Sequence, residues 1–128
     1  MSKRRMTRLS LLADLRQMLA RPDTKVIQRR MLVCGKSTWE ISGDGNKPPV
    51  KNITIYLDPR RDGKVRLVIH ELLHIRMQVL LGIDKEMVYD LEEAAILAWE
   101  SYLYQWLHKP EQHVALESWN QAITRKMR

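Results

Sequence analysis

The segment His70-Glu71-Leu72-Leu73-His74 constrains this chain more than any other feature. It lies within the apolar run Val65–Ile75, and residues 65–81 contain neither proline nor glycine. This pattern predicts a buried helix. Because each helical residue turns the chain by about 100°, His70 and His74 would lie one turn apart on the same face. Two imidazoles at that spacing can bind one zinc ion.

Glu71 lies one step around the predicted helix from His70. A carboxylate there can reach a water on the metal without binding the metal itself. This division of roles is typical of zinc peptidases with an H-E-x-x-H motif, in which the Glu accepts the proton of the water. The alternative is a purely structural helix, which would need a core hydrogen-bond partner for each of three buried polar groups.

The length of the chain, 128 residues, is that of one domain with a modest core, spanning residues 1–128. Its one cysteine, Cys34, can form no internal disulfide, and there is no cysteine pair to bind zinc. The apolar stretch near the N-terminus ends at Asp14, which is too short for a signal peptide, and no segment approaches the length of a membrane span. We therefore expect a cytoplasmic protein without membrane contact.

The formal net charge of +7 is distributed in clusters: residues 3–5, 29–30, 60–61 and 125–128. A positive surface attracts nucleic acid or other polyanions without specifying them, and it also favours solubility. The Trp and Tyr residues fall mostly in the second half at helical spacing, which indicates core packing rather than a base-stacking platform. Contact with nucleic acid through the basic clusters is therefore an open expectation.

The remaining patterns predict an α+β protein with an N-terminal helix and a short, mostly antiparallel sheet. Leucines at helical spacing predict a helix over residues 7–20. Strands are expected near 30–34 and at 37–42, pairing as a hairpin, and a clearer one at 51–58, in which Ile53, Ile55 and Leu57 share a face. Two helices should follow the His-containing one, from an Asp84 cap to His108 and from Pro110 onward.

A zinc site with two His residues needs a third protein ligand. No His lies between His74 and His108, and the next predicted helix offers five acidic candidates: Glu86, Asp90, Glu92, Glu93 and Glu100. Glu92 lies in the middle of the apolar stripe of that helix, where an unpaired carboxylate is costly. Glu93 lies about 100° away on a more polar face shared with Glu100, which we expect to be mostly solvated. The helical wheel favours Glu92 as the ligand, with Glu93 as the alternative.

Residues 50–107, a strand, an H-E-x-x-H helix and a following helix with a Glu, resemble the zincin metallopeptidases of gluzincin type. The stretch Glu92-Glu93-Ala94-Ala95 is similar to the E-x-x-A stretch of Ste24-type peptidases and of the ImmA/IrrE group, which implies Glu92 as the ligand. An E-A pattern would instead select Glu93. SprT-like proteases are similar in size and basic charge, but their third His has no counterpart here. The Asp or Asn that often follows the family's Glu is replaced by Ile96.

The resemblance also implies a role for the strand before the metal helix. In zincins this strand lies at the sheet edge, so Ile53, Thr54, Ile55 and Tyr56 would pair with an extended peptide substrate. The implied function is a peptidase that cleaves peptide bonds with Zn²⁺-activated water and Glu71 as general base. The alternative is a zincin-like zinc-binding module that binds a protein or nucleic-acid partner without catalysis.

Overall fold

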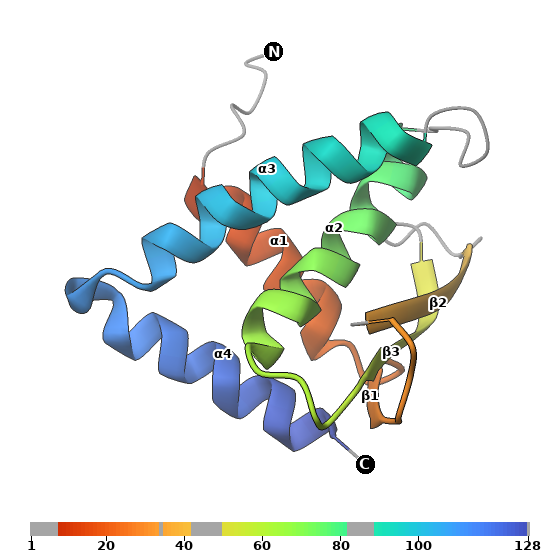
Figure 1. The fold of residues 1–128 in the computed structure, drawn as a ribbon, viewed down its shortest axis with the longest axis horizontal. Coiled ribbons are helices and arrows are strands. Elements are labelled where there is room, and N and C mark those ends of the chain that lie inside the picture. Colours follow the sequence, from red (N-terminus) through yellow and green to blue (C-terminus); the bar gives the residue numbers. More distant parts are fainter. Residues whose placement is uncertain (1–7, 34, 42–49, 82–88, 128) are drawn as a thin grey trace.

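The computed structural model describes residues 8–33, 35–41, 50–81 and 89–127, without the side chains of residues 8, 9, 41, 78–81 and 89–92. Figure 1 shows an α+β fold in which one helix precedes three strands and further helices follow. The elements are α1 (Arg8–Ala20), β1 (Lys25–Gln28), β2 (Gly35–Ile41), β3 (Val50–Leu57), α2 (Lys64–Leu81), α3 (Tyr89–Leu107), the 3₁₀ helix η1 (Pro110–Gln112) and α4 (His113–Lys126).

The three strands form a mixed sheet in the order β1-β3-β2, with β1 parallel and β2 antiparallel to β3. The expected antiparallel hairpin is therefore wrong, and so is the strand near 30–34. Residues 29–33 belong to no strand, since the first strand lies earlier, at β1. Because β1 and β2 lie on opposite sides of β3, the chain between these two strands has to cross from one side of β3 to the other.

Strand β3 lies at the centre of the sheet, so the edge position expected for residues 53–58 is also wrong. Thr54, Ile55 and Tyr56 each pair with a residue on both neighbouring strands. Their backbone is thus already engaged within the sheet. Among the described residues, β2 is the edge strand on the side opposite β1.

The inward face of β3 follows the predicted alternation, with Ile53, Ile55 and Leu57 all buried. The alternation breaks at Asn52, which has a positive φ of 53°. This local left-handed residue shifts the pattern by one, so that Val50 rather than Lys51 enters the core. Asn and Asp are the non-glycine residues that adopt this conformation most readily.

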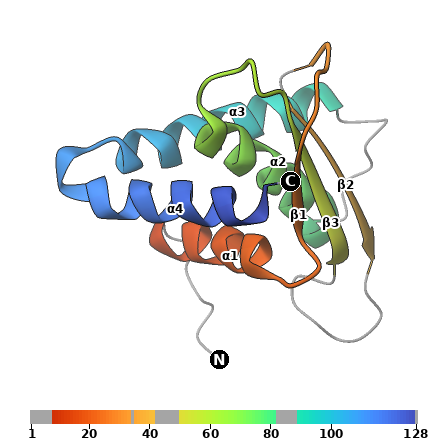
Figure 2. The ribbon, with the colours of Figure 1, turned by 90° about the horizontal axis from the view of Figure 1, so that it is seen from below.

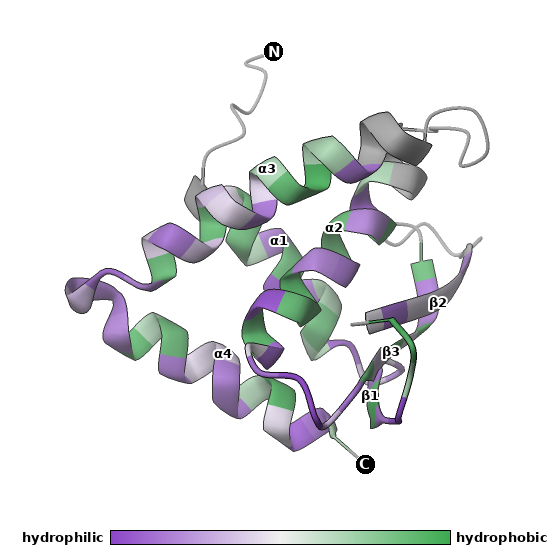
Figure 3. Ribbon diagram, viewed as in Figure 1, coloured by the Kyte–Doolittle hydropathy of each residue, from purple (hydrophilic) through white to green (hydrophobic). Residues whose placement is uncertain are grey.

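Helix α2 is the central element of the fold, in contact with α1, α3, α4, β2 and β3. Seen from below in Figure 2, the helices lie largely to one side of the sheet. Hydrophobic and hydrophilic residues alternate along the helices in Figure 3, as amphipathic helices require. Val68, Ile69, Leu72 and Ile75 carry the buried face of α2 and are fully enclosed. His70 and His74 lie at the border of this buried face and are themselves half-buried.

The C-terminal helices match the predicted pattern. Helix α3 ends at Leu107, three residues before Pro110, which opens η1. Helix α4 buries Trp119, Ala122 and Ile123. The predicted Asp84 cap lies outside the described residues. None of the described helices is long and apolar enough to cross a membrane.

Candidate metal centre

His70 and His74 present their Nε2 atoms to one another from adjacent turns of α2. These two nitrogens lie 3.1 Å apart, and the ring centroids are 4.8 Å apart. Helix α3 packs against α2 and brings Glu93 to the same point. The Glu93 carboxylate lies 3.2 Å from Nε2 of His70 and 2.9 Å from Nε2 of His74. These three residues form a cluster that could hold a metal ion.

The size of this cluster fits a small tetrahedral ion. Nitrogen and oxygen ligands lie about 2.0–2.1 Å from zinc, so two of them on a tetrahedral ion are separated by about 3.3–3.4 Å. The two Nε2 atoms are 3.1 Å apart, Nε2 of His70 lies 3.2 Å from Oε1 of Glu93, and Nε2 of His74 lies 2.9 Å from Oε2 of Glu93. Each pair of atoms is thus near this spacing, with a different carboxylate oxygen next to each histidine. The side chains remain 15, 14 and 30% exposed for His70, His74 and Glu93, so the cluster is reachable from solvent.

The charge at the cluster also calls for a cation. With two neutral imidazoles, the ionised Glu93 carboxylate leaves the three groups with a net charge of −1. Burial alone would lower the pKa of His70, but the carboxylates of Glu100, Glu93 and Glu71 outweigh it and raise that pKa. The site therefore attracts positive charge, which a proton or a metal ion can supply.

Glu71 lies on α2 next to His70, where the motif predicts it, and is only 8% exposed. The first residue of β2 lies against it: a Cβ atom built on Gly35 would be 3.4 Å from Oε2 of Glu71. The edge strand β2 thus begins beside the carboxylate expected to act as base. Glycine leaves this side of Glu71 open.

A further buried carboxylate, Glu100, lies behind His70; it is one of the five acidic candidates, but the wheel predicted it on a mostly solvated face. Its Oε1 accepts from Nε of Arg66 at 3.2 Å, and its Oε2 lies 3.6 Å from Nδ1 of His70. Burial would raise the pKa of Glu100, but His70 and Arg66 hold it below its ordinary value. The sequence did contain a signal, because Glu100 follows Glu93 by seven residues, or two helical turns on one face.

The structure brings together His70, His74 and Glu93, the last of which was the alternative third ligand. The expectation that the face of Glu93 and Glu100 is mostly solvated is wrong, because this face packs on α2. The side chain of Glu92, favoured by the helical wheel, lies outside the described residues. The metal identity stays a prediction. The pairing of Ile53–Tyr56 with a peptide does not, because β3 is the central strand and is already paired on both sides.

Comparisons with protein-family models, with curated proteins and with solved structures gave no match. The resemblance to zincins therefore rests on the H-E-x-x-H motif and on the geometry of the cluster.

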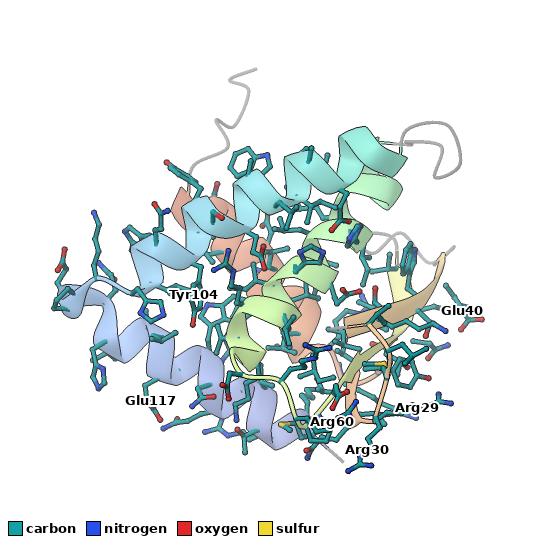
Figure 4. The ribbon with its side chains drawn as sticks, in the orientation of Figure 1. Arg29, Arg30, Glu40, Arg60, Tyr104 and Glu117 are labelled. Atoms are coloured by element: carbon teal, nitrogen blue, oxygen red, sulfur yellow. The ribbon has the colours of Figure 1, made fainter. Side chains whose placement is uncertain are left out.

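The basic clusters are partly assembled in space. Figure 4 labels Arg29, Arg30 and Arg60 at the same end of the sheet. Arg60 is held there by Asp58 and by the backbone oxygen of Met31. This concentrates positive charge on one surface, and contact of that surface with nucleic acid stays a prediction.

Proposed function

We propose that this chain is a zinc-dependent peptidase in which His70, His74 and Glu93 hold the metal and Glu71 is the general base. The observation that carries this proposal is that Nε2 of His70 and Nε2 of His74 lie 3.1 Å apart on α2, the helix that also carries Glu71, and that the Glu93 carboxylate of α3 lies 3.2 and 2.9 Å from them. Each component has the residue type that hydrolytic zinc chemistry uses.

The donor set supports zinc in particular. Two imidazoles and one carboxylate are a common ligand set of catalytic zinc sites, which leave a further position for water or substrate. Imidazole nitrogen also suits iron, copper and nickel, so the identity of the ion is part of the proposal. Bound zinc would supply a Lewis acid for the scissile carbonyl and lower the pKa of the attacking water.

Glu71 would accept the proton from the attacking water and pass it to the leaving amine. Its burial supports this role, because the packing around a side chain that is only 8% exposed limits the positions its carboxylate can take. Gly35 leaves space beside the carboxylate oxygen, where a larger side chain would press on it.

The substrate would bind along β2 rather than along β3. Among the described residues β2 pairs on one side only, and it begins at Gly35, in contact range of Glu71. An extended peptide can add to such an edge through backbone hydrogen bonds, with side chains providing selectivity. The role expected for residues 53–56 is thus transferred to the neighbouring strand.

The test compares the wild type with Glu71→Gln, each loaded with one equivalent of zinc, on a mixture of unstructured peptides of varied sequence. We expect mass spectrometry to detect cleavage by the wild type, lost on chelation and restored by zinc. Glu71→Gln should retain zinc and cleave about 10²–10⁴-fold more slowly, because the amide cannot accept the proton.

Two results would contradict the proposal. Cleavage by Glu71→Gln at the wild-type rate would exclude Glu71 as the base. Stoichiometric zinc without cleavage of any peptide would favour the alternative function, a zinc-binding module that acts by contact with a partner.

A further inference from the structure

Glu100 is a buried carboxylate that the proposed reaction does not use. It is only 4% exposed, and its Oε2 has no hydrogen bond among the residues that the structure describes. An unpaired oxygen on a buried carboxylate is costly, so its surroundings need an explanation. Its neighbour there is Nδ1 of His70, at 3.6 Å, on the side of the ring opposite the metal cluster.

The two nitrogens of His70 thus face two different carboxylates. Nε2 lies 3.2 Å from Glu93 and Nδ1 lies 3.6 Å from Glu100. A neutral imidazole carries one proton, and only the nitrogen without it can bind a metal. A carboxylate at Nδ1 favours the proton there, which leaves the lone pair of Nε2 directed at the cluster.

Arg66 holds Glu100 from the other side. It lies one turn before His70 on α2 and its Nε lies 3.2 Å from Oε1 of Glu100. The same guanidinium donates to Oγ of Ser101 at 3.3 Å and lies 5.5 Å from the ring centroid of Tyr104, which is labelled in Figure 4. Three contacts with α3 therefore fix this arginine and, through it, the Glu100 carboxylate.

We infer that Glu100 is a positioning residue, which keeps the proton of His70 on Nδ1 and presents Nε2 to the metal, with Arg66 bracing its carboxylate. This inference rests on the metal centre proposed above.

The test measures zinc affinity by chelator competition, and the visible spectrum of the cobalt-substituted protein, for the wild type, Glu100→Ala and Glu100→Gln. Loss of an outer carboxylate typically lowers metal affinity by about 10–100-fold. We expect that loss for Glu100→Ala, together with a changed cobalt spectrum. Glu100→Gln should lose less zinc affinity than Glu100→Ala, because its amide oxygen can still accept from one of the two donors, His70 or Arg66.

Leu103→Ala is the matched control, since Leu103 is a fully buried residue one turn further along α3. It should lower the melting temperature by opening a cavity, while zinc affinity and the cobalt spectrum of the folded protein stay at wild-type values. This separates damage to the fold from loss of the outer carboxylate.

Wild-type affinity and spectrum in Glu100→Ala would overturn the inference. So would a loss as complete as that of His70→Ala, because Glu100 would then be a ligand rather than a positioning residue. Failure of the metal centre itself would look different, since the wild type would then bind neither zinc nor cobalt.

Discussion

Two adjacent glutamates, Glu92 and Glu93, are the candidates for the third ligand of the proposed metal centre. The Glu93 carboxylate contacts both imidazoles, at 3.2 and 2.9 Å. We predict that Glu93→Ala weakens zinc binding by more than about 100-fold, since even outer-shell losses reach that range. Glu92→Ala, the matched control one residue away, should retain zinc. Chelator competition on both variants at one pH checks this, because ligand protonation couples to affinity. The reverse order would assign the ligand to Glu92.

The sequence predicts the α2 half of this site and leaves the α3 half unresolved. His70, Glu71 and His74 follow from spacing along a single helix, which helical geometry fixes. A helical wheel gives the angle of Glu93 and Glu100 about their own axis but not how that helix lies across α2. The helical wheel predicts that the apolar stripe faces the histidines, whereas the carboxylate that reaches them, Glu93, lies on the flank of that stripe.

Gly35 provides the second prediction at this scale. A Cβ atom there would meet Oε2 of Glu71 at 3.4 Å, an ordinary contact, so Gly35→Ala should keep most of the peptidase activity. Gly35→Val places two methyl groups on that Cβ atom, and these would push on the Glu71 carboxylate. We expect zinc to be retained and kcat/KM to fall by about 10²-fold, the effect of a misplacement of about 1 Å. Equal activity of the Ala and Val variants would show that Gly35 does not set the position of Glu71.

At the scale of elements, the connection between β1 and β2 depends on Asp58. Its buried carboxylate accepts hydrogen bonds from the backbone N–H of Met31, at 3.1 Å, and from the backbone and side chain of Arg60. The Arg60 hydrogen bonds hold the pKa of Asp58 well below its ordinary value. Asp58 thereby ties the crossing segment to the end of β3.

A group whose pKa is lowered by folding stabilises the protein above its unfolded pKa, and this contribution is lost as the pH falls toward its folded pKa. We therefore predict that Asp58→Asn lowers the free energy of unfolding at pH 7, and that the difference from wild type narrows below about pH 4. Urea unfolding at pH 7 and pH 3 measures both. The control is Asp62→Asn, an exposed residue nearby, which should change little. A difference that grows on acidification would contradict this role.

The sequence predicts an element correctly where its hydrophobic pattern is long and regular. The alternation in β3 and the long apolar run of α2 predicted both correctly. Residues 31–33 are apolar, a pattern that predicts a strand, but Leu32 and Val33 are exposed and lie between β1 and β2. Strand β1 is only four residues long, too short for a clear periodic signal, and its parallel pairing with β3 is a long-range contact.

At the scale of the whole molecule, the site combines opposite electrostatic features. The chain carries a net charge of +7, yet three carboxylates, from Glu71, Glu93 and Glu100, surround the histidines. A local anionic centre attracts a divalent cation, while the basic exterior favours anionic partners. Because α2 contacts most of the other elements, a metal on this helix would join α3 to the sheet-bearing part of the fold.

Metal analysis combined with X-ray absorption spectroscopy on the purified wild type tests the central claim, a zinc centre at His70, His74 and Glu93. After dialysis against buffer with zinc and then without it, we predict about one zinc per chain. The absorption spectrum should fit nitrogen and oxygen ligands only, including two imidazoles. Failure to retain zinc, or a sulfur ligand from the one cysteine, Cys34, would contradict the account.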